Sequence, residues 1–252
     1  MKQAAKDRLR AGVIGCSQVG LTHARAYLEN PAVELVGLCD INAELLRACS
    51  ARLHVPGYHS GDELLESSQP DLVSVVVRFD GLVPPVRRCL EAGVNVFSEK
   101  PVSFSSREIM RLIELAERKD VQFGVNFNQR FAHGSAWFKK LREAGQFGQI
   151  LWTLSQYNQG GGEDHYALRE YMIHQFDLWR YHIGEVASVT AQARWSDTGK
   201  AKSDPEVVAA TMQFVDGPLG VFTNAGLLGA ADKAAYVVRC KSSCRQLPRS
   251  AG

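Results

Sequence analysis

Three observations predict an α/β protein whose first domain has a doubly wound parallel sheet of the Rossmann type and whose second domain is α+β with a mostly antiparallel sheet. Short apolar runs alternate with helical patterns up to about residue 126. The first run leads directly into a glycine-rich turn. Beyond residue 126 this alternation gives way to two helices and several extended runs. We therefore expect a first domain over residues 8–126, a second, incomplete domain over residues 127–238, and a disordered tail over residues 239–252.

The elements of the first domain follow from local patterns. Residues 71–77 form a nearly continuous β-branched run, which is typical of a strand buried on both faces of a parallel sheet. Pro84 and Pro85 are suited to the start of a helix, and Ala92 and Gly93 to its end. Strands are expected over residues 8–14, 33–39, 71–77, 94–98 and 121–125, and helices directly after the glycine turn and over residues 43–53, 62–67, 84–92 and 105–119.

The turn that follows the first strand has the features of a dinucleotide site. Glycines let the backbone approach a pyrophosphate, a helix N-terminus offers N–H groups to this anion, and a carboxylate binds the ribose hydroxyls. Ser17 occupies the middle position of the turn, where such sites usually have glycine. Asp40 ends the second strand and favours NAD over NADP, because a carboxylate repels the 2′-phosphate. The residues predicted to form this site are Gly15, Ser17, Gln18, Val19, Gly20 and Asp40. A purely structural strand-turn-helix connection is the alternative.

In the second domain we expect helices over residues 131–144 and 166–182, a glycine loop over residues 159–162, a turn over residues 216–218, and strands over residues 148–157, 186–195, 206–215 and 220–223. On a helix with about 100° per residue, the long segment 166–182 separates into two faces. An apolar stripe contains Leu168, Met172, Phe176, Trp179 and Ile183. A polar face contains Glu170, His174, Asp177 and Tyr181.

His174 is the candidate general base on this polar face. Glu170 lies four residues before it and Asp177 three residues after it, so each carboxylate can contact the imidazole on a continuous helix. A carboxylate partner fixes the tautomer of a histidine and raises its pKa toward neutrality, which suits a base that deprotonates an alcohol. A solvated helix face with incidental ion pairs is the alternative.

Lys100 is the second candidate for catalysis. It follows the strand over residues 94–98, and ligands of open parallel sheets bind beyond the carboxyl ends of the strands. A lysine there donates hydrogen bonds to a substrate oxygen and stabilises developing negative charge. An exposed surface lysine is the alternative. Pro101 fixes the chain where it leaves the strand and permits a cis peptide bond.

Composition argues against several classes of protein. The net charge is +2, and no basic cluster is interleaved with aromatic residues, so nucleic acid is not an expected partner. No apolar run reaches about 18 residues and the first ten residues lack an apolar signal region, so we expect a cytoplasmic protein without a membrane partner. The six cysteines lack zinc-site spacing, and no metal is expected. The remaining histidines are expected to be structural or surface residues, except that the role of His165 is left open because it borders the glycine loop; they are His23, His54, His59, His133, His165 and His182.

The glycine turn, the segment Glu99-Lys100-Pro101 and the pattern acid-x-x-x-His-x-x-Asp together resemble the Gfo/Idh/MocA family of NAD(P)-dependent oxidoreductases. This resemblance extends over about residues 8–238. It implies a nicotinamide cofactor, a sugar, polyol or related alcohol as the substrate, and association of subunits through the sheet of the second domain. By position, Lys100 would hold the substrate hydroxyl and His174 would accept its proton. Glu170 would contact the neighbouring hydroxyl, and Asp177 would orient His174.

The resemblance also implies cofactor contacts outside the glycine turn. Glu99 and Pro101 would shape the nicotinamide pocket together with Lys100, and Asn128 and Arg130 would reach its edge. Three features depart from the family pattern: Ser17 in the turn, Glu170 in place of the more frequent aspartate, and Arg78-Phe79-Asp80 after the strand over residues 71–77. Arg78 is expected near the cofactor, where it can offset the repulsion between Asp40 and the 2′-phosphate of NADP.

Family members usually continue for about a hundred residues more, so the chain resembles a shortened member. Two further functions therefore stand beside a dehydrogenase. One is a glycosidase of the same family, which oxidises its substrate transiently and reduces it again. The other is a non-catalytic nucleotide-binding protein or truncated remnant. A methyltransferase fits least, because the segment with Lys100 and the polar face with His174 would have no role in it.

Overall fold

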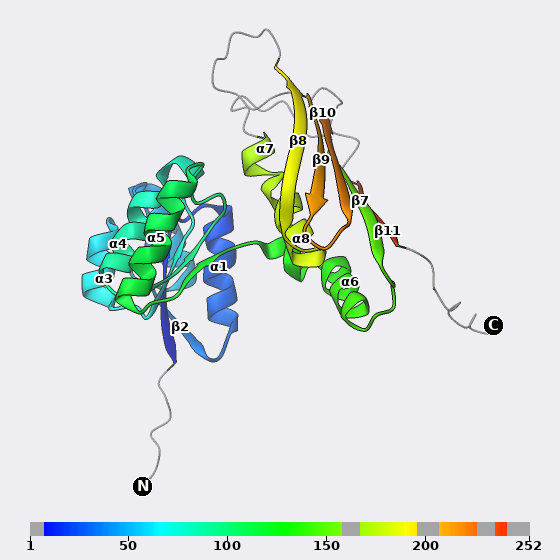
Figure 1. Cartoon of the computed structure of the whole chain (residues 1–252). Helices are drawn as coiled ribbons and strands as arrows, with labels where there is room; N and C mark the ends of the chain where they lie inside the picture. Colours follow the sequence, from blue (N-terminus) through cyan, green and yellow to red (C-terminus); the bar gives the residue numbers. More distant parts are fainter. Residues whose placement is uncertain (1–7, 158–166, 196–206, 226–234, 241–252) are drawn as a thin grey trace, which may run out of the picture. The chain divides into compact units, whose positions relative to one another are not determined.

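The computed structural model describes residues 8–157, 167–195, 207–225 and 235–240 (Figure 1). The chain divides into two compact units, Met1–Asn126 and Phe127–Gly252. The predicted glycine loop over residues 159–162, His165 and most of the predicted tail lie outside the described residues. None of the described helices is long and apolar enough to cross a membrane.

The first unit is built on a six-stranded, entirely parallel sheet with the strand order β3-β2-β1-β4-β5-β6. Its strands are β1 (Leu9–Ile14), β2 (Val33–Cys39), β3 (Gly57–Tyr58), β4 (Leu72–Val75), β5 (Asn95–Ser98) and β6 (Phe123–Val125). The predicted Rossmann-type sheet is thereby confirmed. The strand order reverses between β1 and β4, and ligands of such sheets bind at this switch point.

Helices cover both faces of this sheet, as the apolar composition of its strands requires. They are α1 (Gln18–Glu29), α2 (Ala43–Leu53), α3 (Gly61–Ser68), α4 (Val83–Glu91) and α5 (Ser106–Lys119). One core cluster joins β4 to helices α3, α4 and α5 through residues such as Leu64, Leu90 and Leu112. A second cluster joins β1 and β2 to α1 and α2 through residues such as Ala24 and Leu46. The sheet therefore has a packed core on each side.

The second unit contains a five-stranded sheet with the order β11-β7-β10-β9-β8. Its strands are β7 (Ile150–Tyr157), β8 (Val186–Arg194), β9 (Val207–Phe214), β10 (Leu219–Ala225) and β11 (Ala235–Cys240). Strands β7 and β10 pair in parallel, and the other pairs are antiparallel, which confirms the predicted mostly antiparallel sheet. Strand β11 continues to Cys240 and so includes the first two residues of the segment predicted to be a tail.

The helices of the second unit are α6 (His133–Glu143), α7 (Ala167–Glu170) and α8 (Ile173–His182), preceded by the 3₁₀ turn η2 (Asn128–Phe131). The prediction of one continuous helix over residues 166–182 was wrong, because the chain turns between α7 and α8. The N–H of Gln175 donates to the carbonyl of Met172 at 2.9 Å, an i−3 bond that tightens the first turn of α8. Met172 is fully buried there, in one core with Trp179, Ile183 and strand residues. The break between α7 and α8 therefore coincides with the packing of Met172 into the core. The sequence has no glycine or proline at this break that would have predicted it.

Candidate active site

The glycine turn lies at the carboxyl end of β1, and its glycines are required by packing. Gly15 has φ +102°, and a Cβ on it would lie 2.1 Å from the carbonyl oxygen of Val76. A Cβ on Gly20 would lie 1.9 Å from the carbonyl oxygen of Gly15. Both distances are far below van der Waals contact, so only glycine fits at either position. The turn can thus pass close to its neighbours and lead directly into α1.

Ser17 is the N-cap of α1. It has extended backbone geometry, and its hydroxyl oxygen accepts a weak hydrogen bond from the N–H of Gly20 at 3.5 Å. The side chains of Ser17, Gln18 and Val19 are exposed at this end of the helix, where anions bind to helix N-termini. Ser17 therefore caps α1 at the position where dinucleotide sites usually have glycine.

Asp40 follows β2 and faces this turn. Its Oδ2 accepts a hydrogen bond from the N–H of Cys16 at 2.7 Å, and its Oδ1 accepts one from the N–H of Asn42 at 2.8 Å. The carboxylate is thereby held beside the glycine turn, in the place expected for a group that binds ribose hydroxyls. The glycine turn, the start of α1 and this carboxylate fit an adenine dinucleotide.

The strand register brings a second set of predicted residues to the same sheet edge. Ile14 pairs with Val75, and Val75 pairs with Ser98, so the residues that follow these strands lie side by side. They include Gly15, Arg78 and the segment Glu99-Lys100-Pro101. The guanidinium of Arg78 is exposed and pairs with Asp80 at 3.4 Å. The peptide bond between Lys100 and Pro101 is cis, as the sequence permitted.

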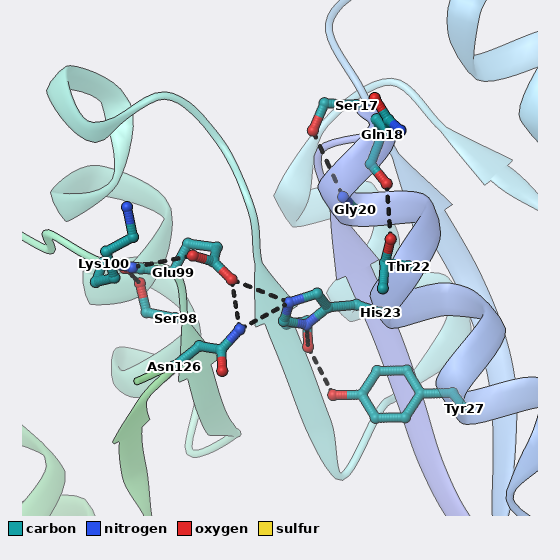
Figure 2. A network of polar contacts seen from close by, with 11 residues as sticks. Ser17, Gln18, Gly20, Thr22, His23, Tyr27, Ser98, Glu99, Lys100 and Asn126 are labelled. Carbon is teal, nitrogen blue, oxygen red and sulfur yellow. Dashed lines mark hydrogen bonds and ion pairs between the residues drawn. The ribbon is translucent and has the colours of Figure 1, made fainter. Parts of the chain in front are cut away.

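His23 belongs to this neighbourhood, which the sequence did not reveal. Its Nε2 lies 3.2 Å from Oε1 of Glu99, and only 9% of its side chain is exposed. His23 was expected to be a structural or surface residue, and its position in the sequence gives no sign of this acidic partner. The two residues are 76 positions apart in sequence, and helix α1 brings them together only because it packs against the sheet (Figure 2). Spacing along a single element cannot detect such a pair.

In the second unit His174 and Asp177 lie on α8 and are buried, with 9% and 7% exposure. The alternative of a solvated helix face is therefore wrong for these two residues. The ring of Phe127 meets the imidazole of His174 edge-on, with 6.0 Å between the ring centroids. Glu170 ends α7 and is half-buried. Glu170 and His174 therefore lie on two separate helices, and not on the one continuous helix that was assumed to place them on a common face.

Asp177 has a different partner from the one predicted. It was expected to orient His174, but its two carboxylate oxygens accept hydrogen bonds from Nε and Nη2 of Arg130. Arg130 lies on η2, and its Cζ is 5.0 Å from the ring centroid of Tyr181. Hydrogen bonding to Asp177 raises the pKa of Arg130 above its ordinary value, so the guanidinium stays charged. Asn128, on the same 3₁₀ turn, is exposed.

The described residues contain no group of three or more histidine, cysteine or acidic side chains that could hold a metal ion. The predicted site residues thus form two groups, one in each unit. The first group contains Gly15, Ser17, Gln18, Val19, Gly20, Asp40, Arg78, Glu99, Lys100 and Pro101. The second contains Asn128, Arg130, Glu170, His174 and Asp177.

Comparison with known proteins agrees with this division. Residues 9–127 match the oxidoreductase family with an NAD-binding Rossmann fold, and residues 136–241 match the GFO/IDH/MocA C-terminal domain. The chain is 31% identical over 231 residues to the myo-inositol 2-dehydrogenase of Thermotoga maritima, covering 86% of this chain and 68% of that protein.

Solved structures give the same result for the fold. A probable dehydrogenase from Thermotoga maritima superposes with a TM-score of 0.77 at 26% identity, over 90% of this chain and 75% of the other. The WlbA dehydrogenase from Bordetella pertussis, solved with NADH and UDP-GlcNAcA, superposes with a TM-score of 0.82 at 20% identity, over 93% and 76% of the two chains. Because both domains and their order match, the chain belongs to the Gfo/Idh/MocA family of NAD(P)-dependent oxidoreductases.

Proposed function

We propose that the protein transfers hydride between a secondary hydroxyl group of a sugar, polyol or related alcohol and NAD. His174 takes the hydroxyl proton on an imidazole nitrogen while the hydride leaves the carbon that carries this hydroxyl. Lys100 donates a hydrogen bond to the same oxygen and stabilises the negative charge that develops on it. Glu170 binds the neighbouring hydroxyl. When bound, NAD supplies the hydride acceptor.

The observation that carries this proposal is the burial of the polar face of α8. Burying a polar side chain costs free energy unless partners compensate it, so proteins rarely bury such groups without a use for them. Here His174 and Asp177 are both more than nine-tenths buried, and Arg130 neutralises Asp177. A histidine in these surroundings is shielded from bulk water, as a general base for an alcohol needs to be.

The cofactor and the substrate class have separate support. Asp40 is held at the glycine turn, where its negative charge favours NAD over NADP. The relative from Thermotoga maritima is named a myo-inositol 2-dehydrogenase, which favours a polyol with adjacent ring hydroxyls. Glu170 is one methylene longer than the aspartate that the family pattern has more often, so we expect a different preference among such polyols.

The decisive experiment compares turnover and cofactor binding in the same variants. With NAD and a panel of sugars and polyols, His174→Ala should lower kcat by about a hundredfold or more, because general base catalysis contributes factors of this size. The dissociation constant of NAD, measured by calorimetric titration, should change by less than about twofold, since the glycine turn and Asp40 are untouched. His133→Ala is the matched control, because His133 is exposed in the same unit.

Equal loss of NAD affinity and turnover in His174→Ala would contradict the assignment. Cleavage of a glycoside without accumulation of NADH would instead identify a glycosidase. Tight NAD binding without turnover on any alcohol of the panel would identify a non-catalytic nucleotide-binding protein.

A further inference from the structure

A chain of partly buried polar groups crosses the first unit from α1 to the segment that carries Lys100. Tyr27 and His23, both on α1, contact the hydroxyl oxygen of Ser74 on β4. The hydroxyl oxygen of Tyr27 lies 2.6 Å from it, and Nδ1 of His23 lies 3.1 Å from it. Nε2 of His23 then reaches Oε1 of Glu99 at 3.2 Å. Figure 2 shows His23 extending from α1 toward Glu99 and Asn126, which directly follow β5 and β6.

Hydrogen-bond chemistry fixes the direction of this chain. An ionised carboxylate only accepts hydrogen bonds, so Nε2 of His23 carries the hydrogen in its contact with Glu99. In the neutral ring Nδ1 is then an acceptor, and the hydroxyl of Ser74 donates to it. The hydroxyl of Tyr27 in turn donates to Ser74. For the neutral ring each donor therefore points toward Glu99, and Nε2 is the nitrogen that carries the hydrogen. The 3.4 Å contact between Nδ2 of Asn126 and Nε2 of His23 is then not a hydrogen bond, because both atoms are donors.

Glu99 is the end point of the chain and has a second donor. Nδ2 of Asn126, at the end of β6, donates to Oε1 of Glu99 at 2.6 Å. Burial raises the pKa of Glu99, but the hydrogen bonds from His23 and Asn126 outweigh this effect and lower the pKa below its ordinary value. The carboxylate is therefore ionised at neutral pH although only 15% of its side chain is exposed.

The other oxygen of this carboxylate faces the catalytic segment. Oε2 of Glu99 accepts a hydrogen bond from the backbone N–H of Lys100 at 3.3 Å. The backbone N–H of Glu99 itself donates to the carbonyl of Val75 at 2.9 Å and so continues the sheet ladder. The Glu99 side chain thus holds the peptide group between Glu99 and Lys100, which is the first one beyond the hydrogen bonds of the sheet. The Lys100 side chain extends from this peptide group.

We propose that His23 and Asn126 are positioning residues that act through Glu99: they hold its carboxylate in one orientation, and this carboxylate fixes the backbone of Lys100 beside the cofactor site. The kinetic consequence rests on the proposed function, because it requires Lys100 to contact the substrate. Small displacements of a catalytic group lower turnover strongly, so loss of this support reduces kcat more than it weakens NAD binding.

The kinetic experiment uses a conservative variant for rescue. His23→Leu removes the donor to Glu99 and should lower kcat by about tenfold or more, with the dissociation constant of NAD changed by less than about threefold. The amide of Gln reaches about as far as Nε2 of histidine, so His23→Gln should restore kcat to within about threefold of the parent chain. Asn126→Leu, which removes the other donor, should resemble His23→Leu. His59→Leu is the matched control, because His59 is exposed in the same unit.

A second measurement needs no substrate. Amide hydrogen exchange in the complete protein should show faster exchange at Lys100 in His23→Leu, by about tenfold, and parent-like exchange in His23→Gln. The amide of Glu99 serves as the internal control, since its partner is the carbonyl of Val75 in both variants. A uniform rise at both amides would indicate general destabilisation and would overturn the inference.

The two measurements separate the inference from the proposed function. Faster exchange at Lys100 in a protein that oxidises no alcohol would refute the proposed function and leave the positioning role standing. Unchanged exchange at Lys100 in His23→Leu, or equal kcat losses in His23→Leu and His23→Gln, would refute the positioning role whatever the activity of the parent chain.

Discussion

Both carboxylate oxygens of Asp177 accept hydrogen bonds from the guanidinium of Arg130, which lies 47 residues earlier in the chain. The bond from Nε to Oδ2 measures 2.7 Å. The side chain of Asp177 is 6% exposed and that of Arg130 37% exposed. The fork of the guanidinium therefore ties η2 to α8 beside His174 and neutralises a carboxylate that has little contact with water.

Arg130→Met should lower the free energy of unfolding of the second unit by about 2 kcal/mol, because it leaves Asp177 buried without its charge partner. Arg180→Met is the matched control. Arg180, which lies on α8, also binds a carboxylate, but its partner Glu185 is 65% exposed, so we expect a much smaller loss than in Arg130→Met. Urea unfolding followed by tryptophan fluorescence measures both changes, since all four tryptophans lie in the second unit. Equal effects of the two variants would contradict the burial argument.

Ser17→Gly should tighten NAD binding by about threefold, because it removes a Cβ and a hydroxyl where the pyrophosphate approaches the turn. Its cost to helix α1 should be only a few tenths of a kcal/mol, roughly the difference between serine and glycine as N-caps. Ser60→Gly, which changes the N-cap of α3, should cost the same stability without any effect on NAD. Calorimetric titration with NAD checks the comparison. Weaker binding in Ser17→Gly would show instead that the serine hydroxyl contributes to the site.

The sequence was sufficient to predict the first unit because its signals are local. The helix over residues 43–53 and the strand over residues 33–39 have the predicted bounds, since apolar periodicity and capping residues both mark their ends. Strand β3 has two residues, too few for any periodic pattern, and was not predicted. Asp40 and the glycine turn were likewise predictable, because a single strand-turn-helix connection sets their spacing.

The sequence was insufficient where tertiary packing decides the structure. Burial of Met172 accompanies the break in the predicted helix over residues 166–182, and helix propensity alone gives no sign of it. The partners of Asp177 and His23 come from other elements, 47 and 76 residues away. Side-chain spacing within one element cannot detect such contacts, so these partners of Asp177 and His23 were not predicted.

Gly20→Ala should destabilise the first unit by about 2 kcal/mol or more, although alanine favours helices by about 1 kcal/mol over glycine. The added Cβ would lie 1.9 Å from the carbonyl oxygen of Gly15, which is backbone and cannot rotate away. Gly61→Ala is the control, since its Cβ would meet Cδ1 of Ile14 at an ordinary 3.5 Å. Urea unfolding followed by circular dichroism should show a loss in the first variant and none in the second. Equal losses of unfolding free energy in Gly20→Ala and Gly61→Ala would contradict the explanation by a clash with the carbonyl oxygen of Gly15.

His182 should make the second unit sensitive to acid. It is 2% exposed, and its Nε2 lies 2.9 Å from the hydroxyl of Ser135. Burial, with the nearby charges of Lys139 and Arg142, lowers the pKa of His182 from 6.5 to about 4. Between these two values the unfolded chain binds a proton that the folded chain does not. The stabilising contribution is therefore complete above pH 6.5 and is lost as the pH falls toward 4.

This contribution amounts to roughly 3 kcal/mol over the whole interval. His182→Gln cannot take up the proton, so its stability should depend less on pH than that of the parent chain. The difference in unfolding free energy between the two proteins, measured by urea unfolding with tryptophan fluorescence, should shrink as the pH is lowered from 6.5 toward 4. His133→Gln, which changes an exposed histidine of the same unit, should follow the parent chain throughout. A difference that stays constant with pH would show that His182 is protonated in the folded protein as readily as in the unfolded chain.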